Sequence, residues 1–430
     1  MSARQLSMFI GDDFTGASDT LATWARSGAR VKLFLDAGEA VRGAKDIDVV
    51  GIATELRGLP ADSIRARVSE IAHSIGGLKP RFVHYKVCST FDSGPETGSI
   101  GAAASEFERV LDPVLTLVLG GQPSLARYCT FGNLFARAAD GQVYRIDRHP
   151  VMRRHPVTPM TEADLAVHLA AQGLDDLQLI SLTQLAAGAE SLAQTLRAGM
   201  AEGACRFLLD AASASDISVI GEALGTISDS RPVLLVGASS VAESLASGTK
   251  GRIVPTPVFP SPRRGGPCLV VAGSRSSVTE QQVSAAATFD KIALAPDTLR
   301  DAATFKNAVG RVSNGLREGR NIVAYTLPGS DYMIDAGALT RYLVDLVAAV
   351  LHNVEIGGLG IAGGDTSSAI CQKLGFSALE FGSDIDPGVS LCIGHHADPA
   401  LDGMLLMLKG GQMGMPDLFD RFAASFISPT

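Results

Sequence analysis

Short runs of β-branched and aliphatic residues alternate with amphipathic stretches through most of the chain, and this alternation constrains the fold more than any other feature. Strands that alternate with helices form parallel sheets whose faces the helices cover. The sequence therefore predicts an α/β fold with mostly parallel sheets. In the first half we expect strands over residues 8–10, 31–35, 48–53, 82–86, 115–119, 177–181, 205–210 and 233–236.

The alternation breaks between Gly248 and Pro267, where five prolines stand among glycines and basic residues. So many helix and strand breakers exclude a regular element there. The alternation then resumes, and we expect strands over residues 268–272, 292–294, 322–326, 360–362, 378–381 and 389–393. We therefore predict two α/β domains, residues 1–250 and 267–430, joined by a linker over residues 251–266, with a ligand cleft between the domains.

The charge balance argues against a nucleic-acid partner. The 430 residues include 37 Lys and Arg against 45 Asp and Glu, a formal net charge of −8, so an anionic ligand needs a local basic site. The longest apolar runs are far shorter than the about 18 residues of a membrane span, and the N-terminus has no signal-peptide pattern. We expect a cytoplasmic protein with small-molecule ligands and no membrane contact; a homo-oligomer is compatible with the sequence.

The six cysteines are widely spaced, and none pairs with a histidine at the spacing of a zinc site. We expect buried free thiols and no metal held by protein side chains.

Two adjacent carboxylates, Asp12 and Asp13, follow the first expected strand in the run Gly11-Asp12-Asp13-Phe14-Thr15-Gly16. Ligands of open α/β sheets bind beyond the carboxyl ends of the strands. Such a pair can accept hydrogen bonds from sugar hydroxyls, hold a magnesium ion, or take a proton from an attacking alcohol. One aspartate could simply cap the next helix, but a cap alone does not explain two acids.

A second polar cluster begins with Lys86, which ends the strand expected over 82–86, and continues into a turn with Ser89 and Thr90. The lysine supplies positive charge, and the two hydroxyls can donate to a carboxylate or a phosphate. Clusters of this composition also form plain turns, and the sequence does not decide between the two.

A basic stretch from Arg145 to His155, preceded by Arg127, is dense in positive charge for an acidic protein. Arginine binds carboxylates with two parallel hydrogen bonds, so this stretch is a candidate anion site. The alternative is a solvated surface loop.

Glycine-rich turns recur in the second half. Ser274 follows one strand, Gly363-Gly364-Asp365-Thr366 follows another, and Gly411 lies in a turn after an apolar run. Free N–H groups at a helix start form an anion cradle, and glycines let a phosphate approach the backbone closely. Two such cradles in one domain suggest a nucleotide, and the third turn could close over it.

Two alternative functions remain open at this point. The run Gly358-x-Gly360-x-x-Gly363 matches the dinucleotide fingerprint, with Glu380 near the place of the ribose-binding acid, as in an NAD-dependent sugar-acid dehydrogenase. That fingerprint must follow a strand, whereas here the strand is expected inside it. The other alternative is a non-catalytic sensor of a sugar acid and a nucleotide.

A series of short motifs, in order along nearly the whole chain, resembles the four-carbon acid sugar kinase family. The motifs are residues 11–17, 86–93, 127–132, 155–160, 273–276, 363–366 and 409–411. The resemblance implies an ATP-dependent kinase, working with Mg²⁺, that phosphorylates the 4-hydroxyl of a four-carbon sugar acid: 3-oxo-tetronate, threonate or erythronate.

The resemblance also assigns residues. It implies ATP contacts at Ser274, Gly363, Gly364, Asp365, Thr366 and Gly411, and a sugar acid surrounded by Asp12, Asp13, Lys86, Ser89 and Arg127. The patterns described above add Thr90 and His155 to the second group. Asp13, or else Asp12, would orient or deprotonate the attacking hydroxyl. The chain departs from the family at Ala126, where many members have glycine, and in the turn of residues 237–240, which leaves open which family substrate is used.

Overall fold

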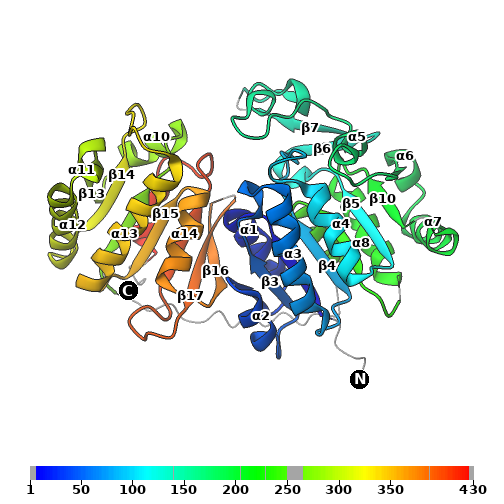
Figure 1. Ribbon diagram of the computed structural model, residues 1–430, viewed down its shortest axis with the longest axis horizontal. Coiled ribbons are helices and arrows are strands. Elements are labelled where there is room, and N and C mark those ends of the chain that lie inside the picture. Colours follow the sequence, from blue (N-terminus) through cyan, green and yellow to red (C-terminus); the bar gives the residue numbers. More distant parts are fainter. Residues whose placement is uncertain are drawn as a thin grey trace. The chain divides into compact units, whose positions relative to one another are not determined.

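The structure is a computed structural model that describes residues 6–138, 140–203, 205–227, 229–248, 265–386 and 388–425. It comprises two compact units, Met1–Pro257 and Val258–Thr430, and each unit is an α/β domain (Figure 1). The predicted fold class is confirmed. The expected linker over residues 251–266 lies, except for Gly265 and Gly266, outside the described residues.

The first unit is built on a sheet in which every described strand pair is parallel, in the order β2-β3-β1-β4-β11-β5-β10-β9. The chain leaves β1 on one side toward β3 and β2, and it continues on the other side from β4, so the switch point lies between β1 and β4. The strands are β1 (Ser7–Gly11), β2 (Val31–Phe34), β3 (Val49–Ala53), β4 (Phe82–Lys86), β5 (Leu115–Leu119), β9 (Gln178–Ile180), β10 (Arg206–Leu209) and β11 (Val233–Gly237).

Helices cover this sheet in two layers of packed neighbours (Figure 1). One layer comprises α2 (Ala37–Gly43), α3 (Ala61–Gly76) and α4 (Ile100–Leu111), and the other comprises α1 (Phe14–Arg26), α9 (Ser240–Gly248), α8 (Ala214–Thr226), α7 (Ala189–Glu202) and α6 (Leu182–Leu185). In α3 the buried side chains recur every three or four residues, from Ile64 through Val68 to Ile71 and Ile75. That spacing places them on one face of the helix, which explains why the helix packs on the sheet.

A small antiparallel sheet, β6-β7-β8, leaves the main sheet after β5 and returns through α5 (Leu165–Ala170). Its strands are β6 (Arg127–Thr130), β7 (Asn133–Arg137) and β8 (Val143–Arg145). The buried carboxylate of Asp210 holds it to β10, because it accepts the amides of Phe131 at 2.6 Å and Gly132 at 2.9 Å. The sequence analysis did not predict these strands, since they are short and rich in polar residues.

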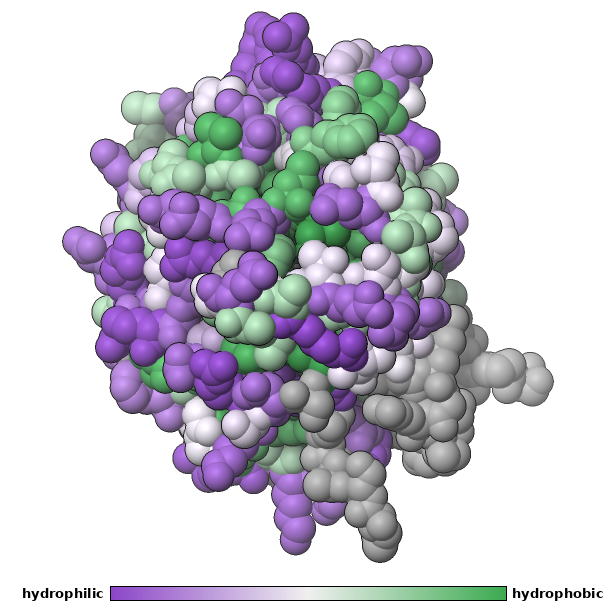
Figure 2. Space-filling model, turned by 90° about the vertical axis from the view of Figure 1, so that its right-hand side faces the viewer, coloured by the Kyte–Doolittle hydropathy of each residue, from purple (hydrophilic) through white to green (hydrophobic). Residues whose placement is uncertain are grey.

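Exposed large hydrophobic side chains concentrate in this excursion and in α5: Phe131, Val143, Val151, Val157 and Val167. Figure 2 views the molecule from the side of α6 and α7, and on that face hydrophobic side chains appear as small areas among hydrophilic ones.

The second unit has the strand order β13-β14-β12-β15-β18-β17-β16. Its strands are β12 (Cys268–Ala272), β13 (Phe289–Leu294), β14 (Asn321–Thr326), β15 (Gly358–Ala362), β16 (Ala378–Asp386), β17 (Val389–His395) and β18 (Leu405–Lys409). The pairs from β13 to β18 are parallel, whereas β17 is antiparallel to both of its neighbours. The sequence analysis predicted β16 and β17 over residues 378–381 and 389–393, although not the antiparallel direction of β17, and it did not predict β18.

Two helix layers also cover the second sheet. In one layer α10 (Ser277–Ala285) packs on α15 (Leu418–Ala424), and their core includes Phe289, Phe419 and Phe422. The other contains α11 (Pro296–Arg300), α12 (Ala302–Arg317), α13 (Ala336–Asn353) and α14 (Gly364–Leu374). Among the described residues, no helix combines the length and apolar character that crossing a membrane requires.

Candidate active site

The carboxyl ends of β1 and β4 bring Asp12, Asp13 and Lys86 together. Gly11 pairs with Lys86 in the sheet, and the Asp12 amide donates to the Lys86 carbonyl at 2.9 Å. The two acids therefore begin the β1–α1 turn directly beside the lysine, at the switch point of the first unit.

Arg57, which the sequence analysis did not single out, joins the two carboxylates. Its Nε donates to Asp12 Oδ2 at 3.1 Å and its Nη2 to Asp12 Oδ1 at 2.7 Å. Nη2 also donates to Asp13 Oδ1 at 2.9 Å. Arg57 lies just after β3, the neighbour of β1, so the signal was an arginine immediately beyond a strand end. The positive charges of Arg57 and Lys86 together balance the negative charges of Asp12 and Asp13.

One carboxylate oxygen of Asp13 caps helix α1, and the other has no hydrogen-bond partner in the described chain. Its Oδ1 accepts the Gly16 amide at 3.0 Å, which caps α1, and it lies 3.6 Å from the Lys86 Nζ. Within the described chain, Oδ2 of Asp13 has no hydrogen-bond partner. The Asp13 side chain is 23% exposed, whereas that of Asp12 is 6% exposed and has both oxygens on Arg57. Asp13 is therefore the carboxylate that a ligand can reach.

The environment separates the pKa values of the two acids. Burial raises the pKa of Asp12 above its ordinary value, and Arg57 compensates only in part. Burial also acts to raise the pKa of Asp13, but Arg57, Lys86 and the Gly16 amide outweigh it, so this pKa is lowered. Two carboxyl groups whose pKa values differ in this way can take different chemical roles. Asp13 remains ionised and can accept a proton or a hydrogen bond.

Gly16 makes room for the lysine. A Cβ atom at this position would collide with Lys86 Nζ and with Asp13 Oδ1. Lys86 is itself buried, and its side chain is only 6% exposed. The first turn of α1 therefore needs glycine for the cation to approach the acid.

In the turn after β4, the hydroxyl groups of Ser89 and Thr90 have different surroundings. Thr90 Oγ1 donates to Asp92 Oδ1 at 2.5 Å and lies 2.9 Å from Cys88 Sγ, so its polar contacts serve the turn itself. Ser89 is half-buried in the same turn, next to the end of β4.

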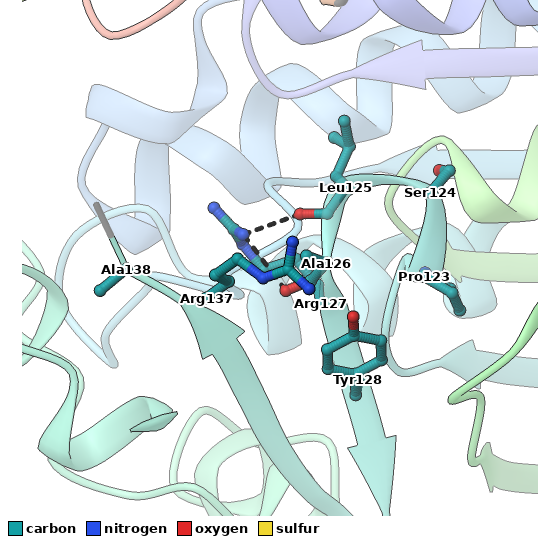
Figure 3. A pocket seen from close by; sticks show the side chains of 8 residues that line it. All are labelled: Pro123, Ser124, Leu125, Ala126, Arg127, Tyr128, Arg137 and Ala138. Atoms are coloured by element: carbon teal, nitrogen blue, oxygen red, sulfur yellow. Dashed lines mark hydrogen bonds between the residues drawn. The ribbon is translucent and has the colours of Figure 1, made fainter. Parts of the chain in front are cut away.

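Arg127 lines a pocket of about 520 Å³ beside the start of β6 and the end of β7, together with the turn of residues 123–126 (Figure 3). Arg127 Nη1 donates to the Leu125 carbonyl at 2.8 Å, whereas its buried Nε has no partner within the described residues. Arg137 and Tyr128 line the same pocket, and no carboxylate does. Two guanidinium groups and a phenol without an acid beside them form a site suited to an anion.

The pocket lies at the same end of the first unit as the two acids. Its residues 123–128 follow the carboxyl end of β5, which is parallel to β11, and β11 is in turn parallel to β4. Burial lowers the pKa of Arg127 below its ordinary value and raises that of Cys88 to about 11, so the thiol is neutral at neutral pH.

His155 has local contacts. Its Nδ1 accepts the Thr158 amide at 3.1 Å, which shapes the loop before α5. In the same basic stretch, Arg145 pairs with Asp147 at 2.5 Å. The described contacts of His155 do not join it to Asp12, Asp13 or Lys86, so the structure supports its loop role.

Three turns of the second unit meet because β12, β15 and β18 are neighbours in the sheet. The Ser274 amide donates to the Ala362 carbonyl at 2.9 Å, and the Gly363 amide donates to the Lys409 carbonyl at 3.0 Å. The Gly411 carbonyl accepts from Ser276 Oγ at 2.5 Å. The residues expected to contact ATP therefore lie together at one end of this sheet.

This arrangement fits a chain of phosphates. Gly363 has a φ of 132°, and a Cβ there would approach Thr366 Oγ1 to 3.2 Å and the Ser274 amide to 3.4 Å. A Cβ on Gly411 would lie 2.5 Å from Ser274 Oγ. Gly363 offers no side chain to cap α14, so N–H groups of its first turn, Gly364 to Thr366, are available to an anion.

The dinucleotide alternative is not favoured. Gly358 and Gly360 lie inside β15, and a Cβ at Gly360 would collide with Met407 and Val270 across the packed sheet. Glu380 Oε1 lies 3.1 Å from His395 Nε2 on the neighbouring strand. Across the described residues, no group of three or more His, Cys, Asp or Glu side chains is arranged to hold a metal ion.

Comparisons with known proteins agree with this division. Residues 7–245 match the family model of a sugar-binding N-terminal domain, and residues 269–419 match that of a nucleotide-binding C-terminal domain. A 3-oxo-isoapionate kinase from Paraburkholderia graminis is 32% identical, over 96% of this chain and 92% of its own. A 3-oxo-tetronate kinase from Cupriavidus necator is 30% identical, over 98% of this chain and 97% of its own.

Solved structures share the fold. A crystal structure from Salmonella typhimurium LT2 superposes with a TM-score of 0.82 at 24% identity, and covers 99% of this chain and 100% of its own. A crystal structure of a Haemophilus influenzae protein has a TM-score of 0.75 at 22% identity, over 98% of this chain and 100% of its own.

Proposed function

This chain belongs to the four-carbon acid sugar kinase family, and from that membership we propose that it transfers the γ-phosphoryl group of ATP to the terminal hydroxyl of a small sugar acid. The first candidate acceptors are 3-oxo-tetronate and 3-oxo-isoapionate, the substrates named for the relatives at 30% and 32% identity. Threonate and erythronate complete the class. The observation that carries the proposal is the pairing of a cation-bound carboxylate cluster in one unit with a glycine-lined phosphate cradle in the other.

In the first unit, Lys86 and Arg127 bind the carboxylate of the acceptor, and the hydroxyls of the sugar acid bind at Asp13 and Ser89. The buried cations and the open Oδ2 of Asp13 support these roles. Asp12 acts through Arg57 as a positioning residue, since both of its oxygens are occupied by the guanidinium.

In the second unit, the first turn of α14 and the hydroxyls of Ser274 and Thr366 bind the phosphates of ATP. The uncapped helix start and the glycines at 363 and 411 support this assignment. Mg²⁺ would be held mainly by the phosphate oxygens and water, and would neutralise charge that develops on the phosphates.

The reaction forms a bond between the acceptor oxygen and the γ-phosphorus and breaks the bond from that phosphorus to the β,γ-bridging oxygen of ATP. The proton of the acceptor hydroxyl passes to Asp13 Oδ2, and ADP leaves. Phosphoryl transfer depends on positioning and charge neutralisation more than on covalent catalysis. A fixed, ionised carboxylate that orients the hydroxyl meets that need.

The test is ADP release measured with ATP, Mg²⁺ and each of the four candidate acids. We expect turnover with at least one acid and none with ATP alone. Lack of turnover with every acid, together with nucleotide binding, would favour the sensor. Thermal unfolding adds a second criterion, because ATP with Mg²⁺ should stabilise the protein and NAD should not.

A further inference from the structure

A lysine lies buried beneath the phosphate cradle of the second unit. Lys409 ends β18 and is 0% exposed. Its Nζ donates to Thr279 Oγ1 at 3.0 Å and to the Gly411 carbonyl at 3.4 Å. Both acceptors are neutral, and among the described residues no carboxylate pairs with this ammonium group.

The ammonium group lies at the N-terminal turn of α10, and the acidic side chain of that turn, Glu280, is exposed to solvent. Thr279 lies in the first turn of α10, which begins at Ser277, so the ammonium faces the positive end of that helix. A helix N-terminus favours anions and disfavours cations. Burial, with no opposing charge, lowers the pKa of Lys409 to about 8, so the group is still mainly protonated at neutral pH.

An unpaired buried charge opposes folding unless something compensates it. Within the described part of the second unit, only hydrogen bonds compensate Lys409. The Gly411 carbonyl that it contacts also accepts from Ser276 Oγ at 2.5 Å and Thr279 Oγ1 at 3.1 Å. The ammonium is thus tied to the turn that approaches Ser274.

We propose that Lys409 is a positioning residue whose counter-charge is the phosphate chain of the bound nucleotide. It holds the Gly411 turn in place and supplies the cradle with positive potential from beneath, without touching the ligand. The inference rests on the proposed function, because it assumes that the cradle takes a nucleotide. The inference adds to the proposed function that the affinity of the site for a nucleotide depends on the charge of the nucleotide's phosphates.

The test compares Lys409→Met, which keeps the length of the side chain but removes its charge, with Lys373→Met, which removes an exposed lysine at the end of α14. Titration calorimetry would give Kd for ATP, ADP, AMP and pyrophosphate, and thermal unfolding would give Tm without ligand. We expect K409M to keep or raise the ligand-free Tm, because a buried unpaired charge is removed. ATP affinity should fall at least tenfold, ADP affinity less and AMP affinity least. K373M should change none of these affinities.

Two results would overturn the inference: unchanged ATP affinity in K409M, or an equal loss for ATP, ADP and AMP, which indicates a merely structural role. If K409M does not fold, Lys409→Gln is measured in the same way. Failure of the proposed function is separable from these outcomes. A wild-type protein that binds pyrophosphate through Lys409 but turns over no sugar acid refutes the kinase and keeps the inference; normal turnover and normal binding in K409M refute the inference alone.

Discussion

At the scale of single residues, two neighbouring aspartates are made chemically different by their hydrogen bonds. Asp12 is buried, and both of its carboxylate oxygens accept hydrogen bonds from Arg57. The three donors near Asp13, which are the Gly16 amide, Arg57 and Lys86, all lie at its Oδ1. The donors fix the Asp13 carboxylate in one orientation and leave Oδ2 without a partner among the described residues. A base that is already oriented needs little reorganisation when the substrate arrives.

Replacing Asp13 by Asn tests this division. Asparagine caps a helix about as well as aspartate, but it removes the carboxylate beside the buried Lys86, so the protein should fold with some loss of stability. Asparagine cannot accept the hydroxyl proton, so kcat should fall by about two orders of magnitude or more. Steady-state kinetics with denaturant unfolding as a control would measure both, and an unchanged kcat would exclude Asp13 as the base.

Removing Arg57 should damage stability as well as activity. Arg57→Met leaves the buried Asp12 carboxylate without its partner, and such a loss destabilises a protein by about 2 kcal/mol or more. Adding Asp12→Asn should recover part of that loss, because the unpaired charge disappears. Urea unfolding of the single and double variants measures the coupling, and independent, additive effects would contradict the pairing.

At the scale of elements, the site depends on how closely α1 approaches β4. Gly16 stands at that contact, since a Cβ would meet Lys86 Nζ and Asp13 Oδ1. Alanine is a better helix former than glycine by about 1 kcal/mol. Helix stability therefore favours alanine at position 16, whereas the close approach of Lys86 requires glycine.

The variant Gly16→Ala should therefore lose activity without losing the fold. We expect KM for the sugar acid to rise at least tenfold, because Lys86 must move, while Tm changes by only a few degrees. Gly77→Ala is a matched control, since a Cβ at Gly77 meets nothing within 4 Å. Equal kinetics for the two variants would show that the lysine position does not matter.

The sequence predicted the elements of this molecule unevenly, and the reasons are physical. The predicted ranges 115–119 and 268–272 coincide with β5 and β12, because strands buried on both faces appear as nearly continuous apolar runs. The strands β6, β7 and β8 were missed, since short polar strands give no such run. Arg57 was missed because it meets Asp12 across 45 positions, and only the fold brings them together.

At the scale of the whole molecule, each unit has its own strands, helix layers and buried hydrophobic side chains, and separate family models match the two units. Such units can fold independently when their cores are complete. The proposed donor site lies entirely in the second unit, and the proposed acceptor site lies entirely in the first.

A chain cut to residues 258–430 should therefore keep the nucleotide site. We expect it to fold cooperatively, to be stabilised by ATP with Mg²⁺, and to show no phosphoryl transfer. Thermal unfolding with and without the nucleotide measures this. If ATP stabilised the full chain against thermal unfolding but did not stabilise the folded fragment, essential nucleotide contacts would lie in the first unit.

The excursion of β6, β7 and β8 carries Arg127 and Arg137 but belongs to neither layer of the main fold, and the Asp210 carboxylate anchors it through backbone amides. Amide anchors are indifferent to side-chain identity. Sequence changes in this small sheet can therefore alter the proposed binding of the acceptor, while the proposed base and the proposed nucleotide-binding turns stay unchanged.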